Sequence, residues 1–265
     1  MRWLMLRGLV REARHWGSFP AEFERIVGAD KSLLIDLPGV GTQVSRPVPL
    51  TVGGMTDDLR ARFLKETSGA GPVGILAVSL GGMIALDWLS RFPHDFDAGV
   101  VINTSAADLS RPWERLRWEQ FGRIASYLFV SELQRERNII AMTAHRADLD
   151  AEQLAATWLE LTRDAPMSAA SAARQLLAGA RSTLPRALYV PTLVLTSRGD
   201  RLVSHQCSER IAARLRLPIV HHQSGGHDLP LDDPQWVGDQ VRSWFSAIPG
   251  RPAAAPTSRP SPPRG

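Results

Sequence analysis

The sequence predicts an α/β fold in which a mostly parallel sheet is flanked by helices. Short apolar runs recur along the chain with helical patterns between them: WLML (3–6), SLLI (32–35), VGILAV (73–78), GVVI (99–102), TLVL (192–195) and PIVHH (218–222). Continuous apolar runs of this length are typical of parallel strands that are buried on both faces. A chain of 265 residues with 44% hydrophobic composition is long enough for one large domain with a full core.

The segments between these runs show helical spacing. Met55, Leu59 and Phe63 recur every four residues, which places them on one face of a helix. The last helix is expected to begin at Asp233, which can cap the first turn, and Pro234 fits the first helical position. The buried face of that helix is expected to consist of Trp236, Val237, Val241, Trp244 and Phe245.

The strand pattern stops between Ala106 and Pro185, and the patterns in this stretch are helical. They cover residues 115–133, 150–164 and 168–180. The simplest account is a helical insertion between two strands of the sheet, which forms a lid over one end of it. We therefore expect a core made of residues 1–105 and 186–248, a lid made of residues 106–185, and a tail, 249–265. The tail is so rich in proline, alanine, serine and arginine that we expect it to be disordered.

Charge and cysteine content exclude several classes of protein. The net charge of +4 comes from scattered arginines and from the tail, without the basic run of a nucleic-acid-binding arm. The single cysteine, Cys207, excludes an internal disulfide, and no CxxC or HxxxH spacing indicates a metal site. No stretch approaches the ~18 apolar residues of a membrane span, and no signal sequence is recognisable, so we expect a cytoplasmic protein.

Three polar residues stand where predicted strands end. Ser79 follows VGILAV within AVSLG, where small residues on both sides permit a strained turn that exposes the hydroxyl. Asp200 follows the first strand after the insertion, and His227 follows the last strand on a pair of glycines. Ligands of an open parallel sheet bind beyond the carboxyl ends of its strands. The order Ser, Asp, His, each at a strand end and with a helical insertion between the first two, is that of a nucleophile-elbow catalytic triad.

With these residues the chain resembles the α/β-hydrolase superfamily. The motifs that carry the resemblance are RGLVREARHW near the start, DLPGVG (36–41), VSLGGM (78–83), VVINTS (100–105), PTLVLTSRGD (191–200) and GGHDLP (225–230). The resemblance implies that Ser79 is the nucleophile, that His227 is the general base and then the acid, and that Asp200 orients the imidazole. It also implies an oxyanion hole formed by the backbone N–H groups of Leu9 and Leu80.

The chain departs from the family pattern in three places. Ala77 occupies the first small position of the elbow in place of glycine, and Arg7 stands where such enzymes commonly have histidine before the glycine of the oxyanion loop. The chain also begins at the strand that bears this loop, whereas most relatives start with an extra hairpin, so either the sheet is smaller or the sequence starts late. Asp228 is an alternative acid, but a sequence neighbour of His227 is badly placed to hold a ring that also reaches Ser79.

We expect a serine hydrolase that cleaves a carboxylic ester or a related acyl bond through an acyl-enzyme, without a metal or an organic cofactor. Its substrate would be a small-molecule or carrier-bound acyl ester, for which Trp16, Trp113 and Phe121 could line the pocket; each of them could instead be core. The alternative is a catalytically silent scaffold with the same fold, which binds an acidic partner such as an acyl carrier protein.

Overall fold

The computed structural model describes residues 1–67 and 71–248, and within them six strands form one sheet. The strands are β1 (Arg2–Leu6), β2 (Leu33–Leu34), β3 (Val73–Val78), β4 (Ala98–Ile102), β5 (Thr192–Ser197) and β6 (Ile219–His222). Their order across the sheet is β2-β1-β3-β4-β5-β6, and every neighbouring pair is parallel. Each strand lies on one of the apolar runs, so the predicted parallel α/β sheet is confirmed.

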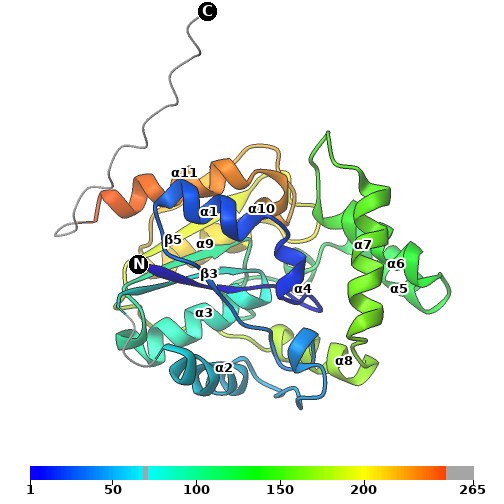
Figure 1. Ribbon diagram of the computed structural model, residues 1–265, viewed down its shortest axis with the longest axis horizontal. Helices are drawn as coiled ribbons and strands as arrows, with labels where there is room; N and C mark the ends of the chain where they lie inside the picture. Colours follow the sequence, from blue (N-terminus) through cyan, green and yellow to red (C-terminus); the bar gives the residue numbers. More distant parts are fainter. Residues whose placement is uncertain (68–70, 249–265) are drawn as a thin grey trace, which may run out of the picture.

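Helices cover both faces of the sheet (Figure 1). α1 (Phe19–Val27) and α11 (Pro234–Ser246) pack on one face, and α2 (Val52–Thr67), α3 (Leu80–Arg91) and α9 (His205–Leu215) pack on the other. Residues of β3 alternate between the two layers: Ile75 and Ala77 join one apolar cluster, and Leu76 and Val78 join the other. This alternation explains why the central strands are continuously apolar. The remaining short elements of the core are η1 (Ala13–Trp16), η2 (Gly41–Gln43), η3 (Pro93–Asp95) and α10 (Leu229–Asp232).

The chain between β4 and β5 forms the helical segment that the sequence predicts. Its elements are α4 (Pro112–Arg115), η4 (Trp118–Gln120), α5 (Phe121–Ala125), η5 (Ser126–Leu128), α6 (Glu132–Thr143), α7 (Ala151–Asp164) and α8 (Ala169–Ala180). Figure 1 shows α5 to α8 beyond the carboxyl ends of the strands. The three longer helices begin at capping side chains, because the oxygens of Ser131, Asp150 and Ser168 accept hydrogen bonds from backbone N–H groups three residues later.

Residues 115–133 differ from the single helical stretch expected there. The chain is extended at Leu116 and Arg117, and short turns follow as far as Leu128. The Arg117 N–H donates to the carbonyl of Leu202 at 2.9 Å. Because this hydrogen bond belongs to a loop of the sheet, tertiary contact replaces the intrahelical bond that the local sequence favours.

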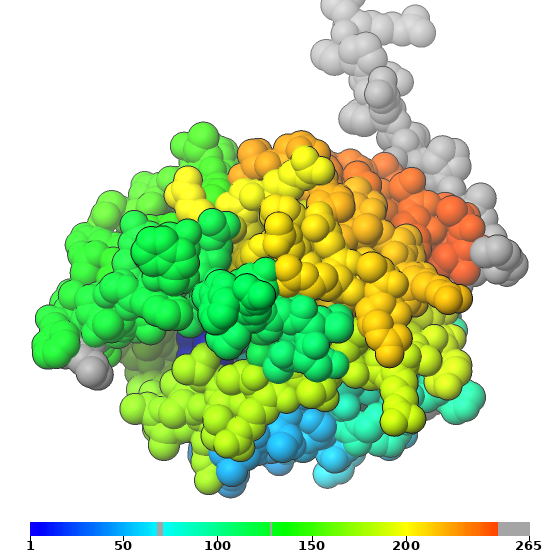
Figure 2. Space-filling view, turned by 180° about the vertical axis from the view of Figure 1, so that it is seen from behind, coloured from blue at the N-terminus to red at the C-terminus, as the bar shows by residue number. Residues whose placement is uncertain are grey.

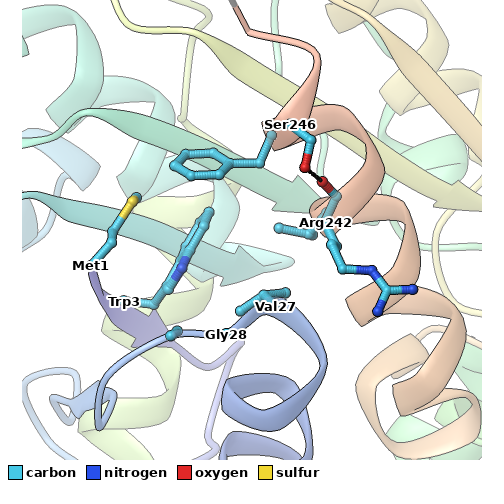
Figure 3. Close-up of a pocket in the computed structure, with 9 residues that line it drawn as sticks. Met1, Trp3, Val27, Gly28, Arg242 and Ser246 are labelled. Atoms are coloured by element: carbon cyan, nitrogen blue, oxygen red, sulfur yellow. Dashed lines mark hydrogen bonds between the residues drawn. The ribbon is translucent and has the colours of Figure 1, made fainter. Parts of the chain in front are cut away.

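The predicted tail, 249–265, lies outside the described residues. In the part of the chain that is described, none of the helices combines the length and the apolar character that spanning a bilayer requires. A small cavity of about 60 Å³ lies between the start of β1 and the ends of α1 and α11 (Figure 3). Met1, Trp3 and Arg242 are among its lining residues. It lies at the amino ends of the strands, opposite the end where Ser79 follows β3.

The contact between α1 and α11 generates a prediction for Gly238. A Cβ atom at this position would lie 2.8–3.0 Å from three atoms of Ile26, which is buried in α1. We expect Gly238→Ala to lower the free energy of unfolding by about 1–3 kcal/mol through overpacking, although alanine favours helix. Gly53→Ala in α2 is the matched control, because its nearest neighbour would be 3.8 Å away. Urea denaturation of both variants checks this; equal stabilities would contradict it.

Candidate active site

Ser79 sits in a strained turn between β3 and α3. Its backbone has φ 56° and ψ −117°, a conformation that is rare for a residue with a side chain. The turn is held by two hydrogen bonds: the Ser79 N–H donates to the Ile102 carbonyl at 2.9 Å, and the Thr104 hydroxyl donates to the Ser79 carbonyl at 2.8 Å. The hydroxyl of Ser79 therefore stands at the carboxyl edge of the sheet, at the start of α3.

The glycines that follow Ser79 are required by close approach. A Cβ atom on Gly81 would lie 2.6 Å from the Arg7 carbonyl oxygen, and one on Gly82 would lie 2.8 Å from Thr104. No side chain fits at either position without displacing the backbone at the end of β1 or the Thr104 side chain. The glycine pair thus lets α3 begin directly against the neighbouring strands.

His227 and Asp200 meet at this edge from two separate loops. The His227 Nδ1 lies 2.7 Å from Asp200 Oδ2, and both side chains are buried. The other carboxylate oxygen of Asp200 accepts hydrogen bonds from the N–H groups of Leu202 and Val203. Burial of the His227 ring disfavours its protonated form, but the charge and hydrogen bond of Asp200 favour that form more strongly. The pKa of His227 therefore lies above its ordinary value.

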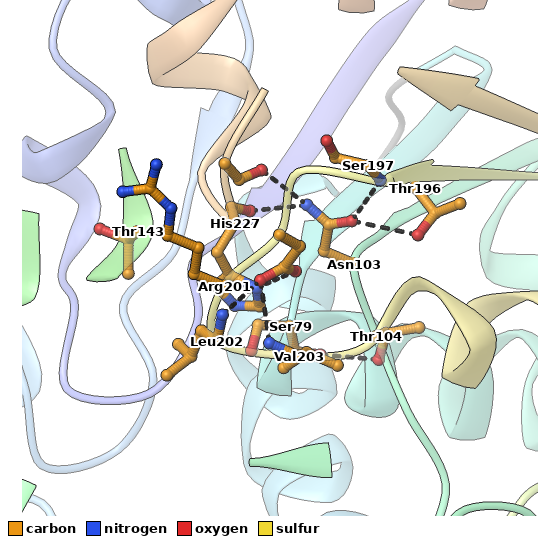
Figure 4. Close-up of polar contacts among 12 residues, drawn as sticks. Ser79, Asn103, Thr104, Thr143, Thr196, Ser197, Arg201, Leu202, Val203 and His227 are labelled. Atoms are coloured by element: carbon orange, nitrogen blue, oxygen red, sulfur yellow. Dashed lines mark hydrogen bonds and ion pairs between the residues drawn. The ribbon is translucent and has the colours of Figure 1, made fainter. Parts of the chain in front are cut away.

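Asn103 joins the loops that carry His227 and Asp200, and sequence reasoning missed it. Its amide Nδ2 donates to the His227 carbonyl at 2.8 Å, and its Oδ1 accepts from the Ser197 N–H at 2.9 Å (Figure 4). The residue follows β4 with φ 47°, a conformation that asparagine tolerates better than most residues. An asparagine directly after a buried strand, in VVINTS, was the available signal.

The loop after β1 passes next to Ser79. A Cβ atom on Gly8 would lie 3.1 Å from the Ser79 Cβ and 3.6 Å from its Oγ. Among the described residues, neither the Leu9 N–H nor the Leu80 N–H donates a hydrogen bond to another residue. Leu80 is the first residue of α3, where backbone N–H groups have no intrahelical acceptor. Both N–H groups that the resemblance assigns to the oxyanion hole are thus unengaged.

Arg7 forms a buried ion pair with Asp228. Its two terminal nitrogens lie 2.9 and 2.5 Å from the two carboxylate oxygens, and its guanidinium lies 4.6 Å from the centre of the Trp16 ring. Both oxygens of Asp228 therefore face Arg7, whereas Asp200 faces His227. The ion pair also connects the end of β1 to the loop of His227. The sequence showed only that Arg7 replaces the histidine common in the family and did not predict this role.

A second buried arginine, Arg11, connects the same loop to the helical segment. It contacts Glu136 of α6 at 2.9 Å and lies 4.3 Å from the centre of the Trp158 ring in α7. It also donates to His15 Nε2 at 2.9 Å. Burial, together with the charge of Arg11, lowers the pKa of His15 to about 2, so the ring is neutral at physiological pH. Like Arg7, Arg11 pairs with an acid that is distant in sequence.

The three aromatic residues considered for the substrate pocket lie in different environments. Trp16 is 4% exposed and stacks on Phe19, with ring centroids 5.4 Å apart. Trp113 and Phe121 are 52% and 49% exposed on the outside of the helical segment. The structure therefore does not bring these three rings together.

Within residues 1–67 and 71–248, no group of three or more His, Cys, Asp or Glu side chains is placed to hold a metal ion. Cys207 is buried in α9, and burial raises the pKa of its thiol.

The chain belongs to the alpha/beta hydrolase family, whose sequence model matches residues 4–240. Three similar solved structures are a protein assigned as a non-heme bromoperoxidase from Mycobacterium tuberculosis, an esterase from Thermogutta terrifontis, and the 2-hydroxy-6-oxo-6-phenylhexa-2,4-dienoate hydrolase of a Rhodococcus species. Their identities to this chain are 18%, 21% and 17%, and their TM-scores are 0.72, 0.66 and 0.72.

The alignments cover 93%, 92% and 93% of this chain and 92%, 89% and 90% of the three structures, in the same order. No curated protein matches the sequence. At these identities the structures show a shared fold, and the chemistry of this chain has to be argued from its own residues.

The Arg7 and Asp228 pair generates a stability prediction. Asp228→Asn leaves the buried guanidinium without its counter-charge, so we expect the free energy of unfolding to fall by about 3–5 kcal/mol. Asp239→Asn is the control, because the Asp239 and Arg242 pair is more than one-third exposed and should contribute no more than about 1 kcal/mol. Urea denaturation measures both changes. Equal decreases in the free energy of unfolding for the two variants would contradict the prediction that the buried pair stabilises the fold.

Proposed function

We propose that this protein is a serine hydrolase that cleaves a carboxylic ester or a related acyl bond through an acyl-enzyme. The observation that carries the proposal is the contact of His227 with Asp200 at the same sheet edge where a strained turn presents Ser79. A hydroxyl nucleophile needs a base beside it, and the base needs a third group that orients it. We assign these three roles to Ser79, His227 and Asp200, which follow β3, β6 and β5.

The roles follow from the contacts. His227 uses Nδ1 to hold Asp200, which leaves Nε2 to take the proton from the Ser79 hydroxyl as that oxygen attacks the substrate carbonyl. The imidazolium that forms is stabilised by the Asp200 carboxylate. His227 then donates the proton to the leaving group, and the same residue activates the water that hydrolyses the acyl-enzyme.

The oxyanion of the tetrahedral intermediate would be held by the N–H groups of Leu9 and Leu80. Their lack of other partners supports this assignment, since an N–H that is already engaged could not serve a developing charge without a cost. Leu80 adds the positive end of α3, a helix of 12 residues. Arg7 would act on the site only indirectly, by holding the loop of Leu9 to the loop of His227.

The substrate is proposed to be a small-molecule or carrier-bound acyl ester, and the helical segment beyond the strand ends would act as a lid that selects the acyl group. Among the similar structures are proteins named as an esterase and as a dienoate hydrolase. A panel of p-nitrophenyl esters of increasing chain length identifies the preferred acyl group. Trp113 and Phe121, which are half exposed, would stand at the entrance of the acyl site rather than in its interior.

Labelling by a fluorophosphonate probe tests the proposal, because only an activated serine reacts. We expect the wild type to be labelled and Ser79→Ala to be unlabelled, with a fall in turnover on the order of a million-fold. Melting temperature should change little, since the substitution removes one oxygen at the surface of the turn. An unlabelled wild type would favour the catalytically silent scaffold instead, and a labelled Ser79→Ala would exclude Ser79 as the nucleophile.

Asp200→Asn tests the role of the carboxylate and the pKa of His227 together. Loss of the negative charge should lower turnover about ten-thousand-fold, because the amide favours the wrong imidazole tautomer. The acid limb of kcat/KM, which reports protonation of the base, should lie at higher pH in the wild type than for an ordinary histidine, because Asp200 raises the pKa of His227, and it should move to lower pH in the variant. Asp228→Asn, measured per folded molecule, should lose far less turnover. A near-normal Asp200→Asn beside an inactive Asp228→Asn would reverse the assignment.

A further inference from the structure

Four large aromatic side chains are exposed on one stretch of the helical segment. Phe129 is 87% exposed, Trp118 67%, Trp113 52% and Phe121 49%. We call these four residues the aromatic face. Figure 2 shows the green atoms of the helical segment as a band on one side of the molecule. So many exposed rings within 17 residues are unusual in a protein that has no partner, because apolar patches on a surface generally mark a binding site.

Arginines are interleaved with these rings. Residues 111–129 contain Arg111, Arg115, Arg117 and Arg123 but only two acids, Glu114 and Glu119. Glu114 forms an ion pair with Arg210 of the core, with 2.7 Å between Arg210 Nη2 and Glu114 Oε1. Within the described residues, neither Arg111 nor Arg123 forms an ion pair, and the Arg111 guanidinium lies 5.4 Å from the centre of the Trp113 ring. The aromatic face therefore carries positive charge that this chain does not neutralise.

Two neighbours of the aromatic face in sequence bind the loop of Asp200. The Arg117 N–H donates to the Leu202 carbonyl at 2.9 Å, and the Gln120 side chain donates to the Arg201 carbonyl at 3.1 Å. Beside the green band, Figure 2 shows a hollow with the dark blue beginning of the chain at its bottom. Between Trp3 and Glu12 only Leu9 and Val10 are partly exposed. The hollow next to the aromatic face thus leads toward the first residues of the chain, which include the loop beside Ser79.

We propose that the aromatic face docks on a membrane surface that contains anionic phospholipid, so that the hollow opens toward the lipid. Tryptophan and phenylalanine rings partition into the boundary between headgroups and acyl chains, and arginines beside them bind anionic headgroups. A protein partner would need pockets for the rings, or a groove that receives its own side chains. Here the rings project from short turns instead, which suits a fluid interface. The binding does not depend on the serine chemistry proposed above.

Co-sedimentation with vesicles tests the docking, using full-length Ser79→Ala protein so that no lipid is hydrolysed. We expect binding to phosphatidylcholine vesicles that contain phosphatidylglycerol as about a third of the lipid, little binding to pure phosphatidylcholine, and weaker binding at about 0.5 M salt. The double variant Trp118→Ala/Phe129→Ala should bind about tenfold more weakly. Tyr189→Ala is its control, because that ring is 76% exposed but precedes β5, at the amino ends of the strands.

Charge reversal provides the second comparison. Arg123→Glu should weaken vesicle binding about fivefold or more, whereas Arg25→Glu should not change it. The two arginines are matched, since both are exposed and each donates to a glutamine side chain, but Arg25 lies on α1. Equal binding by all variants, or no binding to anionic vesicles, would overturn the proposal. So would loss of a dimer, or of binding to an acidic carrier protein, in the aromatic variant without any effect on vesicles.

Discussion

The start of α3 touches the end of β1 so closely that no side chain can stand between them, and the site depends on this contact. A Cβ on Gly81 would collide with the carbonyl of Arg7, one residue before the loop that runs past Ser79. The parallel pairing of β1 with β3, which aligns Leu6 with Ala77, brings the two strand ends to the same level. The pairing of β1 with β3 and the close approach of Gly81 to Arg7 together bring the loop of Leu9 next to the hydroxyl of Ser79.

The other loops of the edge have no regular structure, and they are held by buried polar contacts. Asn103 joins the loop of Asp200 to that of His227, and Arg7 joins the end of β1 to the residue after His227. A buried arginine is tolerated only beside a counter-charge, since removing it from water costs several kcal/mol. Each such contact therefore specifies one arrangement of loops that could otherwise move independently, at positions where apolar packing is sparse.

The helical segment between β4 and β5 has two different sides. Toward the core it presents Glu136 and Trp158 to Arg11, so a charged contact fastens it to the loop beside Ser79. Toward solvent it presents the aromatic face, whose four rings are about half or more exposed. The helical segment is thus attached to the core on one side and exposed on the other. A ligand that binds the aromatic face therefore contacts a segment that is already attached to the loop beside Ser79. This coupling is available because Arg117 and Gln120 hold the loop of Asp200.

The parallel α/β sheet can be predicted from the amino-acid sequence, since continuous apolar runs indicate burial on both faces of a strand and need no partner to be recognised. The sequence also predicts that Ser79, Asp200 and His227 follow strands, because a change from apolar to polar residues marks a strand end. The resemblance to the α/β-hydrolase superfamily also led us to expect Asp200, rather than Asp228, beside His227. The tertiary structure adds the pairing of Asp228 with Arg7, since partners 221 residues apart leave no local pattern. For the same reason it alone broke the stretch 115–133 into short turns: a hydrogen bond to Leu202 outweighed the local preference for helix.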